Sequence, residues 1–171
     1  MKKRRGHSLA ELLAALSIIC TAAAIAAPAL ARTLEAQKHT AALNQMLSAL
    51  QFSRASAVFE RNSMLLCSGQ EICNDSPNWS DHLIVFKDIN NNGRRDATEP
   101  LMRYEPLPSG YSWHWASFRK LTYAAFEPDG TSRAANGTLT LCNLGSPKKQ
   151  IIINLTGRIR HQPPGTSAAC H

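Results

Sequence analysis

The C-terminal part of this sequence lacks acidic residues: no Asp or Glu follows Asp129 in a chain of 171 residues. Basic residues continue to its end, and this asymmetry indicates a surface suited to an anionic partner. The total charge of +7 is less informative, because four of its positive charges stand together at residues 2–5. The basic residues after Asp129 are Arg133, Lys148, Lys149, Arg158 and Arg160.

The sequence also lacks the short motifs of common enzymes. It contains no nucleophile elbow, no phosphate-binding loop and no HExxH pair. No two cysteines have the CxxC spacing and the six histidines are scattered, which argues against a zinc site. We therefore expect no enzymatic activity, no cofactor and no metal, with one calcium candidate as the exception.

That candidate is the segment 88–99, DINNNGRRDATE, which has the spacing of a calcium-binding loop. Oxygen ligands at alternate positions suit Ca²⁺. However, both flanks resemble strands and not the helices of an EF-hand, and two arginines lie inside the loop. Asn, Asp and Gly also suit a hairpin loop for conformational reasons, which is the interpretation we favour. The candidate ligands are Asp88, Asn90, Asn92, Asp96 and Glu99.

One long apolar run, from Leu12 to Ala31, follows a short basic leader that ends at Gly6. About twenty apolar residues are enough to cross ~30 Å of hydrocarbon. The basic residues before the run predict that this end stays cytoplasmic. Glu11 lies at the start of the run, where an ionised carboxylate is costly to desolvate. An ordinary secretory signal would not explain this glutamate.

This combination resembles the type III leader of type IV pilins and pseudopilins. The resemblance implies that a prepilin peptidase cuts after Gly6 and that His7 becomes the methylated N-terminus. Glu11 would then be available to neutralise the N-terminal amine of a neighbouring subunit during filament assembly. The implied segments are 1–6 as leader, 7–31 as transmembrane and filament-core helix, and 32–171 as a periplasmic or extracellular domain.

Beyond the apolar run the pattern becomes amphipathic and then β-rich. Leu43, Met46, Leu47 and Leu50 recur at helical spacing, which predicts a helix from about residue 7 to 61, kinked at Pro28. We predict an α+β, type IV pilin-like fold, in which this helical spine packs on a C-terminal antiparallel β-sheet. The expected strands are 64–67, 82–87, 101–104, 111–115, 121–126, 138–142 and 150–155.

Four cysteines lie outside the apolar run and allow three pairings. We favour Cys67–Cys73, which closes a small loop, and Cys142–Cys170, which attaches the tail to a strand. The oxidising side of the inner membrane would permit both bonds. Cys20, inside the apolar run, is interpreted as a small buried hydrophobic residue.

The segment GRIR at 157–160 is the sharpest candidate site. In an extended strand, Arg158 and Arg160 project to the same side, about 6.5–7 Å apart. Guanidinium groups suit phosphate because their planar donors can bind two oxygens at once. Gly157 would let the backbone approach a ligand or permit a turn with positive φ. Trp113 and Trp115, the alternative contacts for bases, share one face of a strand and are assigned to the core.

The order of a helix, VFKD, an Asn-rich turn, FEPDG, a Cys-bearing strand and GRIR resembles the FimT and GspH minor pilins and pseudopilins, FimT most closely. In FimT proteins the GRxR motif is associated with DNA binding in natural transformation. The resemblance implies a minor type IV pilin that assembles with other pilins and binds DNA phosphates through Arg158 and Arg160, with Lys148 and Lys149 beside them.

Two alternatives remain open at this point. One is a GspH-like minor pseudopilin of the type II secretion system, and the other is a purely structural pilus-assembly subunit. All three interpretations imply the same location before assembly: a single pass through the inner membrane, with the C-terminal domain in the periplasm. A pilus subunit would then reach the filament at the cell surface.

Overall fold

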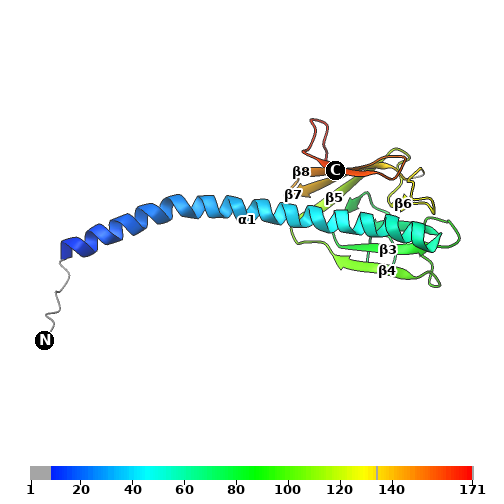
Figure 1. The fold of residues 1–171 in the computed structure, drawn as a ribbon, viewed down its shortest axis with the longest axis horizontal. Coiled ribbons are helices and arrows are strands. Elements are labelled where there is room, and N and C mark those ends of the chain that lie inside the picture. Colours follow the sequence, from blue (N-terminus) through cyan, green and yellow to red (C-terminus); the bar gives the residue numbers. More distant parts are fainter. Residues whose placement is uncertain (1–8, 134, 171) are drawn as a thin grey trace. The chain divides into compact units, whose positions relative to one another are not determined.

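The computed structural model describes residues 9–133 and 135–170. In this part of the chain one helix, α1 (Leu9–Glu60), is followed by nine strands (Figure 1). The chain divides into two compact units, Met1–Lys38 and His39–His171, and the division falls within α1. The strands are β1 (Ser63–Ser68), β2 (Asn78–Trp79), β3 (His82–Asp88), β4 (Leu101–Pro106), β5 (Tyr111–Ser117), β6 (Ala124–Phe126), β7 (Gly137–Asn143), β8 (Ser146–Ile153) and β9 (Ile159–Gln162).

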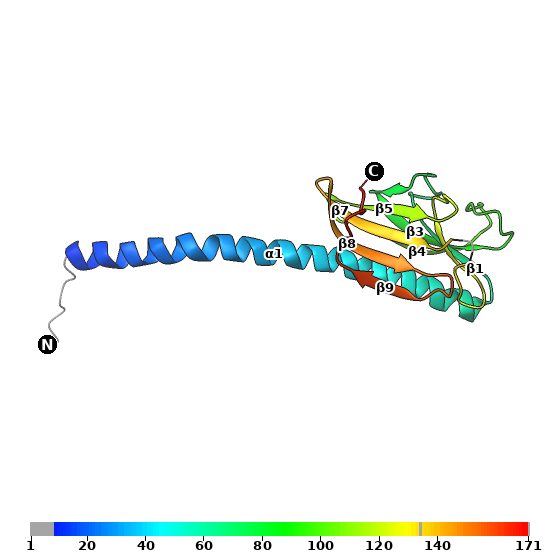
Figure 2. The same cartoon turned by 90° about the horizontal axis from the view of Figure 1, so that it is seen from above.

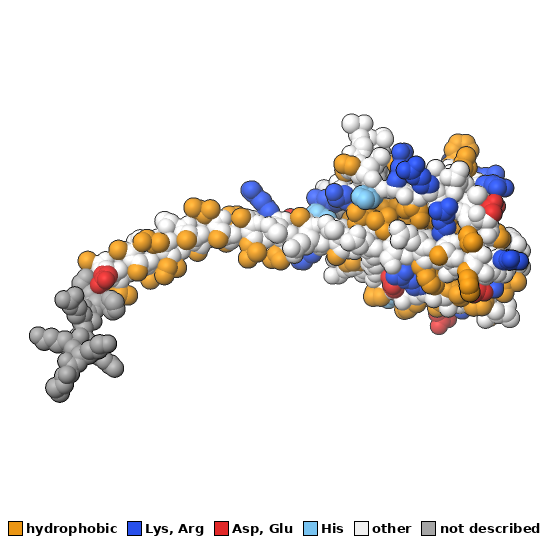
Figure 3. All heavy atoms as spheres, in the orientation of Figure 1, with side chains coloured by type: hydrophobic (Ala, Val, Ile, Leu, Met, Phe, Trp, Pro, Cys, Tyr) orange, Lys and Arg blue, Asp and Glu red, His pale blue; other side chains and the backbone are white. Residues whose placement is uncertain are grey.

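The first unit is helical throughout its described residues, 9–38, and the helix continues through Pro28. Its large apolar side chains are exposed in the single chain (Figure 3). The hydroxyls of Ser17 and Thr21 donate to carbonyls one turn back, at 2.8 Å and 2.9–3.0 Å. Polar groups that are satisfied within the helix suit a hydrocarbon environment. Within the described residues, α1 is the helix long and apolar enough, by length and composition, to cross a membrane.

The second half of α1 carries the predicted apolar stripe. Leu43, Met46 and Leu50 are buried, and Leu47 is partly buried against them. The helix ends where Arg61 adopts a φ of 53°, and the N–H of Asn62 donates to the carbonyl of Ala57 at 3.3 Å. This pattern of a left-handed residue and a long backward hydrogen bond is a common helix ending.

The strands form two antiparallel sheets, where the sequence suggested one. The smaller has the order β4-β3-β1-β6, and the larger has the order β2-β5-β7-β8-β9. In β3, Leu83 and Val85 face the main core with α1, whereas Ile84 and Phe86 enter a second, smaller core. Burial on both faces explains why β1 and β3 read as continuous apolar runs and not as alternating ones.

All three tryptophans belong to the main core, as the sequence predicted for Trp113 and Trp115. Trp79, Trp113 and Trp115 are almost completely buried. The indole N–H of Trp79 donates to the carbonyl of Thr122 at 3.1 Å, and that of Trp115 donates to the carbonyl of Tyr123 at 3.0 Å. These bonds attach the segment before β6 to the larger sheet.

Two disulfide bonds are present, Cys67–Cys73 and Cys142–Cys170, and they are the pairs that the sequence favoured. Gln150 adds a polar attachment for the tail: its side chain accepts the N–H of Gly165 at 3.1 Å. The tail is thereby held against β7 and β8, on the face of the larger sheet away from α1. Cys20, interpreted as buried, is exposed on α1 in the single chain.

Candidate nucleic-acid interface

The GRIR segment forms the end of a tight turn and the start of β9, which pairs with β8. Asn154, at the start of this turn, holds it closed by three hydrogen bonds to Gly157 and Arg158. Its side-chain oxygen accepts the N–H of Arg158 at 2.8 Å, and its backbone carbonyl accepts the N–H of Gly157 at 2.9 Å. The N–H of Asn154 in turn donates to the carbonyl of Arg158 at 3.2 Å. Both backbone polar groups of Arg158 are therefore fixed.

The side chains of Arg158 and Arg160 are exposed, while Ile159 between them packs against the main core. With Asn154, the two arginines line a hollow of about 230 Å³. Neither guanidinium forms an ion pair with another residue in the described part of the chain. Figure 3 shows basic side chains over the region of the C-terminal strands. The hollow thus brings two cationic groups together, and within the described residues neither has an ion-pair partner.

Gly157 serves the fold of this turn. Its φ is +72°, a conformation that residues with a Cβ rarely adopt. A Cβ at this position would also collide with the backbone carbonyl oxygen of Gly130. The sequence left two roles open for Gly157, a close approach of the backbone to a ligand or a turn with positive φ. The structure has the positive-φ turn, and the backbone of Gly157 also lies close to the turn that contains Gly130.

Arg54, on α1, is a residue that the sequence analysis did not single out. Its Nε donates to the carbonyl of Gly130 at 2.9 Å, and its Nη2 to the carbonyl of Thr156 at 3.4 Å. The first carbonyl belongs to the FEPDG turn and the second to the GRIR turn. An arginine on the polar side of an amphipathic helix gives no sequence signal for such a role, because its partners are backbone atoms far along the chain.

The other basic residues lie farther away. Arg160 pairs with Ile152 on β8, so Lys149 is three residues along that strand, or about 10 Å. Lys149 pairs with the buried Leu141, on the opposite face from Arg160, and Lys148 is the extra residue where the register shifts. Arg133 forms an ion pair with Asp129 at 2.7 Å. The structure therefore brings Arg158 and Arg160 together but does not join the lysines or Arg133 to them.

An apolar groove of about 660 Å³ adjoins Arg158. It lies between the end of α1 and β9, which run alongside each other in Figure 2. Val58 and Phe59 contribute side chains that are 51% and 85% exposed. Arg158 lines both this groove and the smaller hollow. Apolar and cationic surfaces thus meet at Arg158.

The groove also contains one carboxylate, that of Asp129. It accepts hydrogen bonds from the Thr131 hydroxyl at 2.6 Å and from Arg133 at 2.7 Å. The bonds from Thr131 and the nearby Arg133 guanidinium hold the pKa of Asp129 below its usual range. Among the described residues, the ion-pair partner of Asp129 is Arg133, and Asp129 forms no ion pair with Arg158.

The calcium candidate forms a loop closed by its own hydrogen bonds. Asp88 accepts the N–H groups of Asn92 and Gly93 at 3.1 and 2.9 Å, and Glu99 accepts those of Ile89 and Asp96 at 2.7 and 3.0 Å. The side-chain amides of Asn90 and Asn92 both donate to Asp96, at 2.7 and 3.0 Å. The side chains of Asp88, Asn90, Asn92, Asp96 and Glu99 thus form hydrogen bonds that hold the loop in its conformation.

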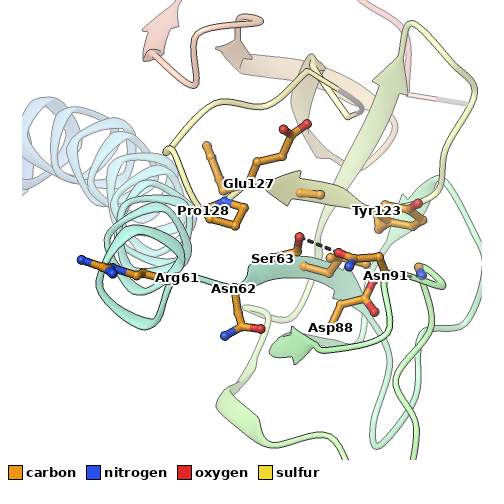
Figure 4. A pocket seen from close by; sticks show the side chains of 12 residues that line it. Arg61, Asn62, Ser63, Asp88, Asn91, Tyr123, Glu127 and Pro128 are labelled. Atoms are coloured by element: carbon orange, nitrogen blue, oxygen red, sulfur yellow. Dashed lines mark hydrogen bonds between the residues drawn. The ribbon is translucent and has the colours of Figure 1, made fainter.

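Asp88 also faces a hollow of about 430 Å³ beside the end of α1 (Figure 4). Ser63 and Asn91 are joined across it by a hydrogen bond of 2.8 Å. Burial raises the pKa of Asp88, with a smaller contribution from Glu99, and burial together with the charge of Asp88 raises the pKa of Tyr123. Among the described residues, no group of three His, Cys, Asp or Glu side chains could hold a metal ion.

The residues of the predicted leader site, Gly6 and His7, lie outside the described residues. Glu11 lies in the first turn of α1. Its part in filament assembly concerns a neighbouring subunit and stays a prediction.

Two crystal structures of the type IV minor pilin FimU from Pseudomonas aeruginosa PAO1 share this fold. One, in space group P65, has a TM-score of 0.58 and 17% identity, and the match covers 77% of this chain and 99% of FimU. The other, in space group P21, has a TM-score of 0.57 and the same identity, with 77% and 94% covered. No curated protein matches the sequence.

A family model, described as type II transport protein GspH, matches residues 42–157. The match takes in residues 42–60 of α1, the eight strands β1 to β8, and Gly157 of the GRIR turn. It stops immediately before Arg158. The match spans more than half of the chain, and the FimU structures share the fold. The chain belongs to the GspH family.

Proposed function

We propose that this chain is a minor type IV pilin close to FimT, which joins a pilus and binds extracellular DNA without sequence preference during natural transformation. The observation that carries the proposal is the pair Arg158 and Arg160, exposed, uncompensated and mounted on a turn whose backbone is fixed. Phosphate contacts supply most of the non-specific affinity for DNA and carry no base identity.

Membership of the GspH family supports the role as a filament subunit. In this proposal a prepilin peptidase removes residues 1–6, and His7 becomes the methylated end of a helix that anchors the chain in the inner membrane. Glu11 neutralises the N-terminal amine of a neighbouring pilin, which makes the burial of both charges tolerable. The C-terminal domain faces the periplasm and later the cell surface.

A GspH-like pseudopilin of the type II secretion system is the second candidate. The family match favours it, because that model is described by the type II transport protein and ends before the two arginines. The two candidates make different demands on Arg158 and Arg160: DNA capture requires them, whereas a role in secretion does not.

Binding of the full chain, in detergent, to a labelled DNA duplex tests the proposal. We expect weak affinity, ~10⁻⁴–10⁻⁶ M at physiological salt, and a clear loss in the double variant Arg158→Ala/Arg160→Ala. Arg119→Ala/Lys120→Ala is the matched control, because it removes two exposed charges outside the motif. Equal losses in the two variants, with both folded, would leave GRIR without a special role and favour a structural subunit.

A further inference from the structure

The groove beside the GRIR turn has a composition that phosphate contacts alone do not explain. Phe59 stands on the last turn of α1 with 85% of its surface exposed, and Val58 before it is 51% exposed. Both line the groove, whose opposite wall carries Ile159 and Arg158. Unlike a single exposed side chain, several apolar side chains that line one groove form a patch of the kind that marks a binding site. Because this patch contains an aromatic ring and adjoins the Arg158 cation, it suggests a ligand that is both flat and anionic.

We infer that this groove accepts an unpaired base of single-stranded DNA, stacked on Phe59, while Arg158 and Arg160 hold the adjoining phosphates. This inference rests on the proposed function and names the form of DNA that the site prefers. Sequence-tolerant binding of single strands combines a cationic track with aromatic side chains, because every base offers a flat face. A volume of about 660 Å³ lies within the common range of pockets for flat organic ligands.

A duplex would use only part of this surface. Its bases are stacked on one another, so their faces are not available to Phe59, and only the phosphates would reach the two arginines. Arg158 immediately precedes β9, Arg160 lies within it, and both line the hollow of about 230 Å³, so the two guanidinium groups can each contact a phosphate of the same extended strand. An apolar side chain of a neighbouring pilin is the competing occupant, but it would leave both guanidinium groups unmatched.

The test compares a short oligothymidylate with the duplex that it forms with its complement, using the full chain in detergent. Phe59→Ala should weaken binding of the single strand about tenfold, which corresponds to the loss of one stacked base, and leave duplex binding unchanged. Phe59→Trp should restore single-strand affinity. Phe118→Ala is the matched control, because Phe118 is also 85% exposed but lies outside the groove.

The outcomes separate the two proposals. If Arg158→Ala/Arg160→Ala weakens both ligands but Phe59→Ala weakens neither, the DNA site stands and the base-binding groove is wrong. If no variant changes either affinity, both proposals are wrong. If Phe59→Ala leaves oligothymidylate binding intact but reduces incorporation into filaments, the groove is a contact between pilins, which also overturns the inference.

Discussion

Arg54 and Gly130 are joined by a hydrogen bond of 2.9 Å from the guanidinium Nε to the backbone carbonyl. The same carbonyl oxygen bounds the space above Gly157, where no Cβ fits. One contact point therefore connects α1, the FEPDG turn and the GRIR turn. The position of the two candidate DNA-binding arginines depends on this junction. Arg54 lies 76 residues before Gly130 and 102 residues before Thr156, so the junction joins distant parts of the sequence.

Replacement of Arg54 should loosen the GRIR turn. Arg54→Ala removes donors to two carbonyls and should lower the free energy of unfolding by about 1–2 kcal/mol. Urea unfolding measures this loss, and amide hydrogen exchange at Gly157 and Arg158 locates it. Arg54→Lys preserves the charge but not both bonds, so faster exchange in that variant shows that geometry matters. Unchanged exchange in both variants would contradict the role of Arg54.

The close approach at Gly157 can be separated from its backbone conformation. Gly157 and Gly145 have φ values of +72° and +73°, but a Cβ on Gly145 would meet no atom within 4 Å. Gly145→Ala should therefore cost about 1 kcal/mol, from the strained conformation alone. Gly157→Ala should cost a further 1–3 kcal/mol or so, because a backbone carbonyl must move. Equal melting temperatures for the two variants would exclude the steric effect.

The two disulfide bonds should differ in their contribution to stability. Cys142–Cys170 spans 28 residues and Cys67–Cys73 spans 6. In the chain-entropy description the longer loop stabilises more, by about 1 kcal/mol, within a typical range of 2–4 kcal/mol. Thermal unfolding of the two double alanine variants measures the difference. Non-reducing peptide mapping checks the connectivity, and a peptide joining Cys73 to Cys142 would refute it.

Asp88 should make the domain less stable as the pH rises above the acid range. Burial raises its pKa above the ordinary value of 3.8, so the folded state binds this proton more tightly than the unfolded state does. The stability that its protonation provides is complete below the unfolded pKa and is lost as pH rises through the folded pKa. Asp88→Asn keeps one acceptor oxygen, so one of the N–H groups of Asn92 and Gly93 loses its partner and the variant should be less stable overall. It should nevertheless lack this decline with pH. The free energy of unfolding of both proteins is measured by urea unfolding at several pH values from about 4 to 7. Parallel pH profiles of this free energy would contradict the prediction.

The sequence predicted those features that depend on local patterns. Apolar spacing located the helix and its buried stripe, including Met46 and Leu50, and turn residues separated most of the strands. The GRIR motif identified Arg158 and Arg160, which line one hollow, although β9 begins only at Ile159. Each of these follows from a pattern that a short window of sequence contains.

Features that depend on distant pairing were not predictable in the same way. The division of the strands into two sheets follows from which strands pair, and β2, with two residues, is too short to give a pattern. Arg54 acts on carbonyls 76 and 102 residues away, so no local spacing reveals it. The separation of Lys149 from Arg160 likewise follows from the register of β8 with β9, which composition does not contain.

The salt dependence of duplex DNA binding tests the central claim most directly. Each phosphate contact contributes about 0.9 to the slope of log affinity against log salt concentration. For the full chain, the double variant Arg158→Ala/Arg160→Ala should bind more weakly and reduce this slope by nearly two, while its unfolding transition stays unchanged. Arg119→Ala/Lys120→Ala should leave the slope close to that of the unaltered chain. The same slope in all three proteins would contradict phosphate binding by the GRIR arginines.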